Sequence, residues 1–148
     1  MEGYGVPPAL DRAAHVEGWW ATGDMGELDA EGYLHLRGRV DDCFKTASDH
    51  LVNPVEVADA LRDHPGVQDV AVVPLTIPAG IVLGALVEAS PSVRSTDLRR
   101  HAAGLLPAWA RPSVLEVVEA LPRLANGKPD RMTCIALLEG ALPRIPAT

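Results

Sequence analysis

The sequence contains few of the residues that build disulfide-rich, aromatic-rich or membrane-spanning proteins. It has only two cysteines, Cys43 and Cys134, and aromatic residues make up 4% of its 148 residues. Two cysteines without metal-ligand spacing indicate free thiols in a reducing compartment. No apolar run approaches the ~20 residues of a membrane span, and no signal-peptide pattern opens the sequence. We therefore expect a soluble, cytoplasmic protein.

Basic residues are also fewer than acidic ones, which gives a formal net charge of -7. This charge argues against a nucleic acid or an anionic membrane as partner. Glycine and proline are abundant by contrast, with 13 of each, which predicts many turns and short elements. With 47% hydrophobic residues, the chain has enough apolar surface for a buried core at the usual size of one domain.

The patterning predicts a small α+β fold, in which a short N-terminal hairpin precedes a three-stranded sheet packed with about three helices. Residues 29–32 form the turn of the hairpin, and Asn53-Pro54 begins a helix as N-cap and first helical residue. The other predicted elements are strands at 67–73, 81–87 and 114–118, a connector at 74–80, a helix at 95–106 with Leu98, Ala102 and Leu105 on one face, and a closing helix at 130–138 stopped by Gly140. Trp19 and Trp20 are predicted to belong to the core.

Three short segments concentrate charged and turn-forming residues. Residues 18–24 read Gly-Trp-Trp-Ala-Thr-Gly-Asp, and residues 38–45 read Gly-Arg-Val-Asp-Asp-Cys-Phe-Lys. Residues 121–131 read Leu-Pro-Arg-Leu-Ala-Asn-Gly-Lys-Pro-Asp-Arg. Taken one at a time, each segment is also compatible with an ordinary solvated turn, since glycine, asparagine and aspartate favour turns for backbone reasons. The Gly-Lys pair at 127–128 lacks the remaining pattern of a phosphate-binding P-loop.

In this order and at these separations, the three segments resemble the signatures of the adenylate-forming superfamily. That superfamily contains acyl-CoA synthetases, peptide-synthetase adenylation domains and firefly luciferase. The segments are similar to its W-x-x-T-G-D, G-R-x-D-x-x-x-K and P-x-x-x-x-G-K elements. The resemblance implies an enzyme that activates a carboxylic acid with ATP to give an acyl-adenylate and pyrophosphate, and then passes the acyl group to a thiol.

The resemblance also implies roles for individual residues. Asp24 and Arg39 would bind the ribose of ATP, and Asp41 would be the hinge of a rotating domain. Lys45 would serve the thioester step, and Lys128 would be the mobile catalytic lysine. No protein-held metal site is expected. Arg123, in the same segment as Lys128, is expected to contribute less.

The same resemblance divides the chain into residues 1–40, the tail end of a large N-terminal domain that includes the T-G-D element, and residues 41–148, a small mobile C-terminal domain. The phosphate loop, adenine-contacting segment and acyl pocket of the superfamily have no counterpart here. We therefore expect the C-terminal portion of an acyl- or aryl-CoA synthetase, inactive alone, within a larger or split enzyme. Its partners would be the N-terminal adenylation domain and a carboxylic acid. ATP and Mg²⁺ would be bound mainly by that domain, and CoA is the expected acceptor.

One departure keeps two alternatives open. The superfamily usually has glycine in the loop that follows Lys45, whereas residues 46–52 contain none and Asp49 stands where glycine would fall. That loop lines the pantetheine tunnel in CoA-forming relatives. The chain could therefore serve an acyl carrier protein instead of CoA, or could be a non-catalytic interaction module that kept the fold. Aspartate tolerates a positive φ better than most residues, so Asp49 is predicted to preserve the backbone shape.

Overall fold

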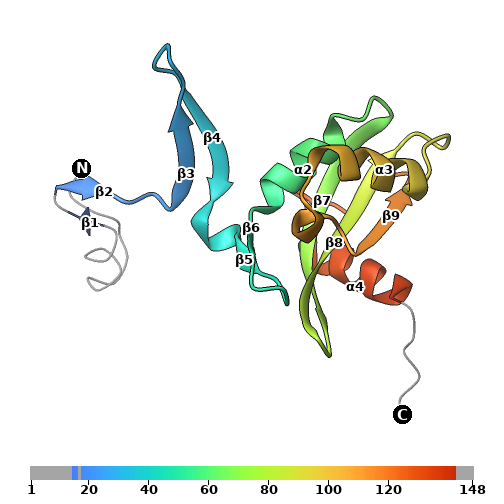
Figure 1. The fold of residues 1–148 in the computed structure, drawn as a ribbon. Helices are drawn as coiled ribbons and strands as arrows, with labels where there is room; N and C mark the ends of the chain where they lie inside the picture. Colours follow the sequence, from blue (N-terminus) through green and yellow to red (C-terminus); the bar gives the residue numbers. More distant parts are fainter. Residues whose placement is uncertain (1–14, 17, 143–148) are drawn as a thin grey trace. The chain divides into compact units, whose positions relative to one another are not determined.

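The computed structural model describes residues 15–16 and 18–142 (Figure 1). These residues fall into two compact units, one within residues 1–42 and the other within 43–148. The sequence places the domain boundary between residues 40 and 41, and the role of Asp41 as a hinge stays a prediction. In the described part of the chain, no helix has the length and hydropathy needed to cross a bilayer.

The first unit is built from antiparallel hairpins. Strands β1 (His15–Val16) and β2 (Trp19–Trp20) pair with each other, as do β3 (Asp24–Leu28) and β4 (Leu34–Arg39). A 3₁₀ turn, η1 (Val40–Asp42), follows β4. The hairpin predicted around residues 29–32 is confirmed, whereas the prediction of Trp19 as a core residue is wrong, because its side chain is 79% exposed. In the described part of this unit, the two-stranded hairpins have no second layer to cover them.

The second unit is organised on a three-stranded sheet. Strands β7 (Val67–Ile77), β8 (Gly80–Ala89) and β9 (Val114–Val118) lie in that order. β7 and β8 form an antiparallel hairpin, and β9 runs parallel to β8. A parallel neighbour requires a crossover, and helix α3 (Ser95–Leu105) lies in it. A small hairpin, β5 (Phe44–Lys45) with β6 (Leu51–Val52), precedes the sheet.

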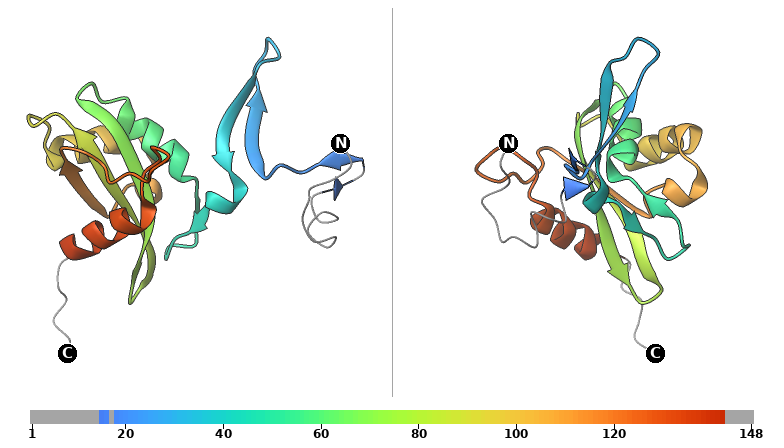
Figure 2. Two further views of the ribbon diagram at one scale, coloured as in Figure 1. Left: turned by 180° about the vertical axis from the view of Figure 1, so that it is seen from behind. Right: turned by 90° about the vertical axis from the view of Figure 1, so that its left-hand side faces the viewer.

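Helices cover both faces of this sheet (Figures 1 and 2). Helices α2 (Pro54–Arg62) and α3 pack on one face, and helix α4 (Arg131–Ala141) packs on the other. Alternate residues of a strand point to opposite faces, so β7 is apolar on both. Val70 and Val72 join the cluster with α2 and α3, while Val73 and Leu75 join the cluster with α4. The predicted α+β architecture is confirmed.

Local sequence signals predicted the positions of the helices, and the structure corrects three details of the predicted elements. Asn53 accepts a hydrogen bond from the Val55 amide over 3.0 Å, as an N-cap should. The predicted connector at 74–80 is mostly strand, because Pro74 lies on the edge strand β7, where a missing donor is tolerated. Helix α4 continues through Gly140 to Ala141. Leu105 is 52% exposed, so it does not share the buried face of α3.

Candidate functional site

The two residues expected at the ribose lie side by side in the first unit. Asp24 opens β3 and Arg39 closes β4, and the two are direct partners in the strand register. Arg39 donates from Nη1 to Oδ1 of Asp24 over 3.0 Å and from Nη2 to the Thr22 carbonyl over 3.3 Å. Gly23 has a φ of 76°, and a Cβ there would lie 3.1 Å from Nη2 of Arg39. The T-G-D turn therefore leaves room for the guanidinium, and the pair presents one carboxylate and one cation together.

The loop that follows Lys45 is a tight turn tied to the sheet. Lys45 Nζ lies 2.7 Å from Oδ1 of Asp49, and the Asp49 amide donates to the Thr46 carbonyl over 2.9 Å. Asp49 has a φ of 64°, as predicted, and is the one non-glycine residue with positive φ in the part of the chain that is described. The Ala47 amide donates to the Ile81 carbonyl over 2.7 Å, which attaches the loop to the turn between β7 and β8. Aspartate here supplies the backbone shape that glycine would give.

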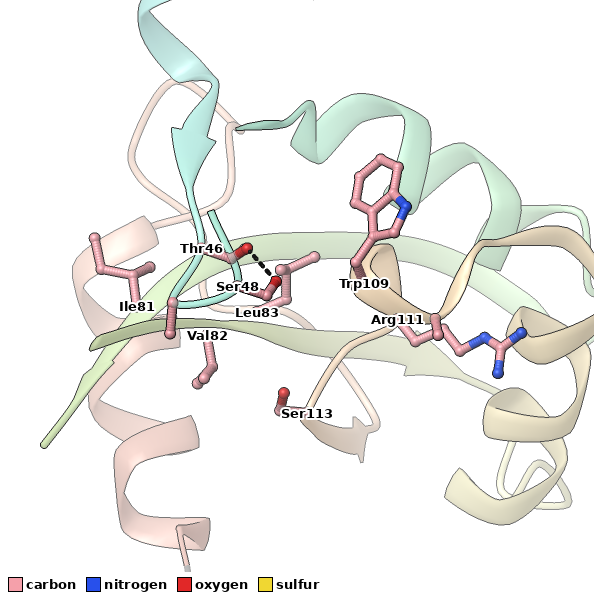
Figure 3. Close-up of a pocket in the computed structure, with 10 residues that line it drawn as sticks. Thr46, Ser48, Ile81, Val82, Leu83, Trp109, Arg111 and Ser113 are labelled. Atoms are coloured by element: carbon pink, nitrogen blue, oxygen red, sulfur yellow. Dashed lines mark hydrogen bonds between the residues drawn. The ribbon is translucent and has the colours of Figure 1, made fainter. Parts of the chain in front are cut away.

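A pocket of about 410 Å³ opens beside this loop (Figure 3). Its lining combines aliphatic side chains with hydroxyl groups and one indole. The lining residues are Thr46, Ala47, Ser48, Ile81, Val82, Leu83, Ala108, Trp109, Arg111 and Ser113. The Trp109 indole stacks on the His50 ring with centroids 4.9 Å apart and planes 7° apart. Arg111 donates to the Ala103 and Leu106 carbonyls over 3.0 Å each, which fixes the guanidinium at the end of α3. This pocket could not be predicted from the sequence, because its walls come from three separate segments.

Lys128 lies in a short turn between β9 and α4. Gly127 takes a φ of 82° and donates to the Leu124 carbonyl over 2.9 Å, while Leu124 donates to the Lys128 carbonyl over 2.8 Å. The Lys128 amide donates to Oδ1 of Asn126 over 3.1 Å. The side chain is exposed, and among the described residues no carboxylate forms an ion pair with its ammonium. The turn therefore presents an available positive charge.

The Lys45 loop and the Lys128 turn lie at opposite ends of the β7–β8 hairpin. The Lys45 loop is attached beside the β7–β8 turn, where Ile81 pairs with Thr76. The Lys128 turn is attached at the other end, where Asp69 pairs with Glu88. At about 3.3 Å per residue, the length of strand from Asp69 to Thr76 corresponds to about 23 Å. The structure therefore does not bring these two lysines together.

Arg123 connects the Lys128 turn to the sheet through side-chain hydrogen bonds, and its smaller contribution to catalysis stays a prediction. It donates to Asp69 over 2.8 Å, to Glu88 over 3.2 Å and to the Gly127 carbonyl over 3.1 Å. The hydrogen bonds to Asp69 and Glu88 raise the pKa of Arg123. Partial burial of the Asp69 carboxyl acts to raise its pKa. Hydrogen bonds from the Val70 amide, Arg123 and Arg62 have the larger combined effect and hold this pKa below its usual range.

Neither a disulfide nor a cluster of metal ligands occurs in the described part of the chain. Cys43 and Cys134 do not form a disulfide, and burial raises the pKa of the Cys134 thiol, which makes it a poor nucleophile. Within residues 15–16 and 18–142, no group of three or more His, Cys, Asp or Glu side chains is placed to hold a metal ion. The described residues therefore do not form a Mg²⁺ site of their own.

Comparisons with known proteins agree on the family. The family described as AMP-binding enzyme C-terminal domain matches residues 56–128. A 4-hydroxybutyrate–CoA ligase of Metallosphaera sedula is 38% identical over 78% of this chain and 22% of its own length. A fatty acid–[acyl-carrier-protein] ligase of Streptomyces coeruleorubidus is 32% identical over 86% of this chain and 25% of its own length.

Solved structures give the same result. The structure of a Mycobacterium tuberculosis fatty acyl CoA synthetase superposes with a TM-score of 0.70 at 30% identity, covering 92% of this chain and 27% of that protein. The chain thus spans about a quarter of the length of these relatives. The matched family, the sequence relatives and the shared fold together show that this chain belongs to the adenylate-forming superfamily and contains its C-terminal domain.

Proposed function

We propose that this chain supplies the catalytic lysine of an AMP-forming acid–thiol ligase, working with a large adenylating domain in the same or a separate chain. In the first half-reaction, a carboxylate oxygen attacks the α-phosphorus of ATP, and the bond to the β-phosphate breaks to release pyrophosphate. Negative charge builds up at the α-phosphate, and the ammonium of Lys128 offsets it. The observation that carries this proposal is an exposed ammonium, without an ion-pair partner among the described residues, on a turn held by backbone hydrogen bonds.

The second half-reaction uses the other end of the same unit. The thiol loses its proton to a solvent base, its sulfur attacks the acyl carbon, and the C–O bond to AMP breaks. The points at which the two loops attach to the hairpin are separated by about 23 Å of strand, which is too far for one reaction centre to use both loops at once. The unit must therefore turn between the two steps, and Asp41, next to the division between the two units, is the proposed pivot.

ATP is positioned by the first unit in this account. Asp24 would accept hydrogen bonds from the two ribose hydroxyls, while Arg39 holds the carboxylate in place. Mg²⁺ would arrive with the triphosphate and be held outside the described residues, which offer no ligand set for it. No step assigned to this chain depends on the metal.

The pocket beside the Lys45 loop favours CoA as the acceptor. Its volume lies within the range of small-molecule sites, and its lining, which includes the Trp109 indole, suits an organic ligand with a planar base. An acyl carrier protein is the alternative acceptor, and the similarity to a fatty acid–[acyl-carrier-protein] ligase keeps it open. Comparing CoA with an acyl carrier protein in parent and Trp109→Ala enzyme separates the two. A loss confined to CoA supports the pocket assignment, and no loss with CoA contradicts it.

A purely structural role for the domain is the second candidate function. The loop without glycine favoured it, but Asp49 adopts the positive φ that glycine would otherwise provide. The loop thus keeps a backbone shape compatible with the thioester step despite the substitution. This supports the catalytic proposal over a non-catalytic module.

The first unit supports the need for a large partner domain. Its β3–β4 hairpin exposes four large apolar side chains, namely Leu28, Tyr33, Leu34 and Leu36. A two-stranded hairpin is marginal in water by itself, and exposed apolar residues at this density mark a surface that another domain covers. We assign this surface to the large adenylating domain.

Pyrophosphate exchange over a panel of carboxylic acids tests the proposal. The 148-residue chain alone should show none, because it carries no loop for the β- and γ-phosphates. The chain combined with its large domain should exchange pyrophosphate with one class of acid. Robust exchange by the chain alone would contradict the assignment of a partner domain.

A further inference from the structure

A cluster of four charged side chains lies next to the Lys128 turn. Arg62 comes from the end of α2, Asp69 from β7, Glu88 from β8 and Arg123 from the turn. Nη2 of Arg62 lies 3.2 Å from Oδ1 of Asp69, and Nη2 of Arg123 lies 2.8 Å from Oδ2 of the same carboxylate. Arg62 also pairs with Asp59 on its own helix over 2.7 Å. The charges of the cluster are therefore engaged with one another, whereas no ion pair of the Lys128 ammonium is found among the described residues.

Both carboxylates of the cluster are fixed to the backbone of the unit. Oδ1 of Asp69 accepts from the Val70 amide over 2.8 Å, and Oε2 of Glu88 accepts from the Leu121 amide over 2.9 Å. Asp69 and Glu88 are also direct partners across β7 and β8. A guanidinium that binds both is tied to the rigid part of the fold, since its planar fork can satisfy several acceptors at defined angles.

The other side of the same guanidinium reaches the residue before the catalytic lysine. Nη1 of Arg123 donates to the Gly127 carbonyl over 3.1 Å. The turn has little apolar packing to hold it, because Leu124 is 49% exposed. Its remaining attachments are backbone hydrogen bonds, including one from the Asp130 amide to the Pro122 carbonyl over 2.8 Å. Arg123 is thus the side chain that joins the turn directly to the sheet.

We infer that Arg123 is a positioning residue for adenylation, which holds the Lys128 turn on Asp69 and Glu88 so that the ammonium reaches the α-phosphate in one defined place. This inference rests on the proposed function of Lys128. We call the Arg123 hydrogen bonds to Asp69, Glu88 and the Gly127 carbonyl the clamp. Loss of the clamp leaves the charge of Lys128 intact but no longer fixes the position of its turn. A displacement of about 1 Å at a reacting centre can cost about a hundredfold in rate. We expect Arg123→Met to slow adenylation by about tenfold to a hundredfold, less than Lys128→Ala.

The functional test compares half-reactions in the enzyme assembled with its large domain. Arg123→Met should lower kcat for adenylation while leaving KM for ATP and for the acid unchanged, and thioester formation from supplied acyl-adenylate should proceed at the parental rate. Arg123→Lys should recover part of the loss, since an ammonium can pair with the carboxylates but cannot span to the Gly127 carbonyl. Arg100→Met is the matched control, because Arg100 is exposed on α3 and pairs only loosely, at 3.6 Å, with Asp97.

Amide hydrogen exchange in the 148-residue chain tests the clamp without any activity. Exchange at the Gly127 and Asp130 amides should quicken at least tenfold in Arg123→Met, whereas exchange in the core of β8 should stay unchanged. Unchanged exchange at the turn overturns the inference, as does parental adenylation by Arg123→Met when Lys128→Ala is inactive. Equal losses in both half-reactions would mean that Arg123 only supports the fold. A fully active Lys128→Ala enzyme would contradict the proposed function of Lys128. In that case the hydrogen-exchange result still shows whether Arg123 holds the turn on the sheet.

Discussion

Arg39 donates a hydrogen bond to Asp24 across strands β3 and β4, with 3.0 Å between Nη1 and Oδ1. The two residues are separated by fourteen others in the sequence, yet the register of the hairpin makes them direct partners. The pair therefore brings the segments 18–24 and 38–45, which were recognised independently in the sequence, next to each other. In the proposed ribose-binding role, the Asp24 carboxylate would be oriented before ATP binds, and such preorganisation lowers the cost of binding.

Breaking this pair should weaken ATP binding without abolishing chemistry. We expect Asp24→Asn and Arg39→Met each to raise KM for ATP by about tenfold, or about 1.4 kcal/mol. Because the residues act together, the double variant should lose less than the sum of the two single losses. The measurement is a double-mutant cycle on ATP-dependent adenylation in the assembled enzyme. The adjacent Glu27–Arg37 ion pair on the same hairpin supplies the control, since Arg37→Met should leave KM unchanged. Strict additivity of the two losses would contradict a coupled pair.

The Lys45 loop should be sensitive to a methyl group at Gly80. Gly80 has a φ of 119°, and a Cβ there would lie 2.9 Å from Cβ of Ala47. Gly80→Ala should cost about 1–3 kcal/mol in folding free energy from backbone strain and should displace the loop. Thioester formation should slow by at least tenfold while adenylation is retained, because Lys128 lies at the other end of the hairpin. Gly104→Ala is the control, since a Cβ there meets nothing within 4 Å. Equal rates for thioester formation in Gly80→Ala and parent would show that the loop position is unimportant.

Helix α4 should lose stability in acid through its N-cap. The Asp130 carboxylate accepts hydrogen bonds from the Thr133 hydroxyl, the Thr133 amide and the Met132 amide. These bonds lower the pKa of Asp130, and the Thr133 hydroxyl has the largest effect. A lowered pKa in the folded state means that the stabilisation is fully present above the unfolded value of ~3.9 and is lost as pH falls through the folded value. Asp130→Ala should therefore lower Tm at pH 7, and its difference from the parent should shrink below about pH 4. Thermal melts from pH 7 to pH 2.5 check this. Glu119→Ala should show no such pattern, because Glu119 is exposed and makes no ion pair with the described residues. A Tm difference that stays constant down to pH 2.5 would rule out the cap.

The proposed hinge makes an asymmetric prediction. Asp41 lies in the 3₁₀ turn η1, and proline fixes φ near −65°, a value compatible with that turn. Asp41→Pro should preserve adenylation and the thermal melt but block the rotation that precedes thioester formation. Asp41→Ala, which leaves φ free, should retain both half-reactions. Single-turnover kinetics on each step make the comparison. Thioester formation at the parental rate in Asp41→Pro would mean that no rotation about Asp41 is needed.

Much of the fold could be predicted because proline, glycine and asparagine mark its boundaries. Asn53-Pro54 began a helix, and the apolar run at Val114–Val118 formed a strand with the predicted ends. Such signals are local, so they failed where the outcome depends on neighbours. Pro74 suggested a connector, yet it lies within β7, which is an edge strand. Trp19 suggested a core residue, but the described part of its unit has no second layer over it.

The candidate site was predictable only where each residue could be recognised in its own segment. Asp24, Arg39, Lys45 and Lys128 were named from their motifs, and the hairpin then placed the first two together. The clamp on the Lys128 turn could not be found in this way, because Arg123 is 54 residues from Asp69 and 35 from Glu88. Nothing in the local sequence of a carboxylate indicates which distant cation it will meet.

The most direct test of the account is single-turnover kinetics on both half-reactions of Lys128→Ala in the assembled enzyme. A preorganised charge at a transition state is commonly worth ~3–4 kcal/mol, so adenylation should fall by two to three orders of magnitude. Transfer from supplied acyl-adenylate to the thiol should survive. Lys45→Ala should show the reverse pattern, because the Lys45 loop lies at the other end of the hairpin. Equal losses of both half-reactions in Lys128→Ala, or none in either, would contradict the assignment of Lys128 to the chemistry of the first step.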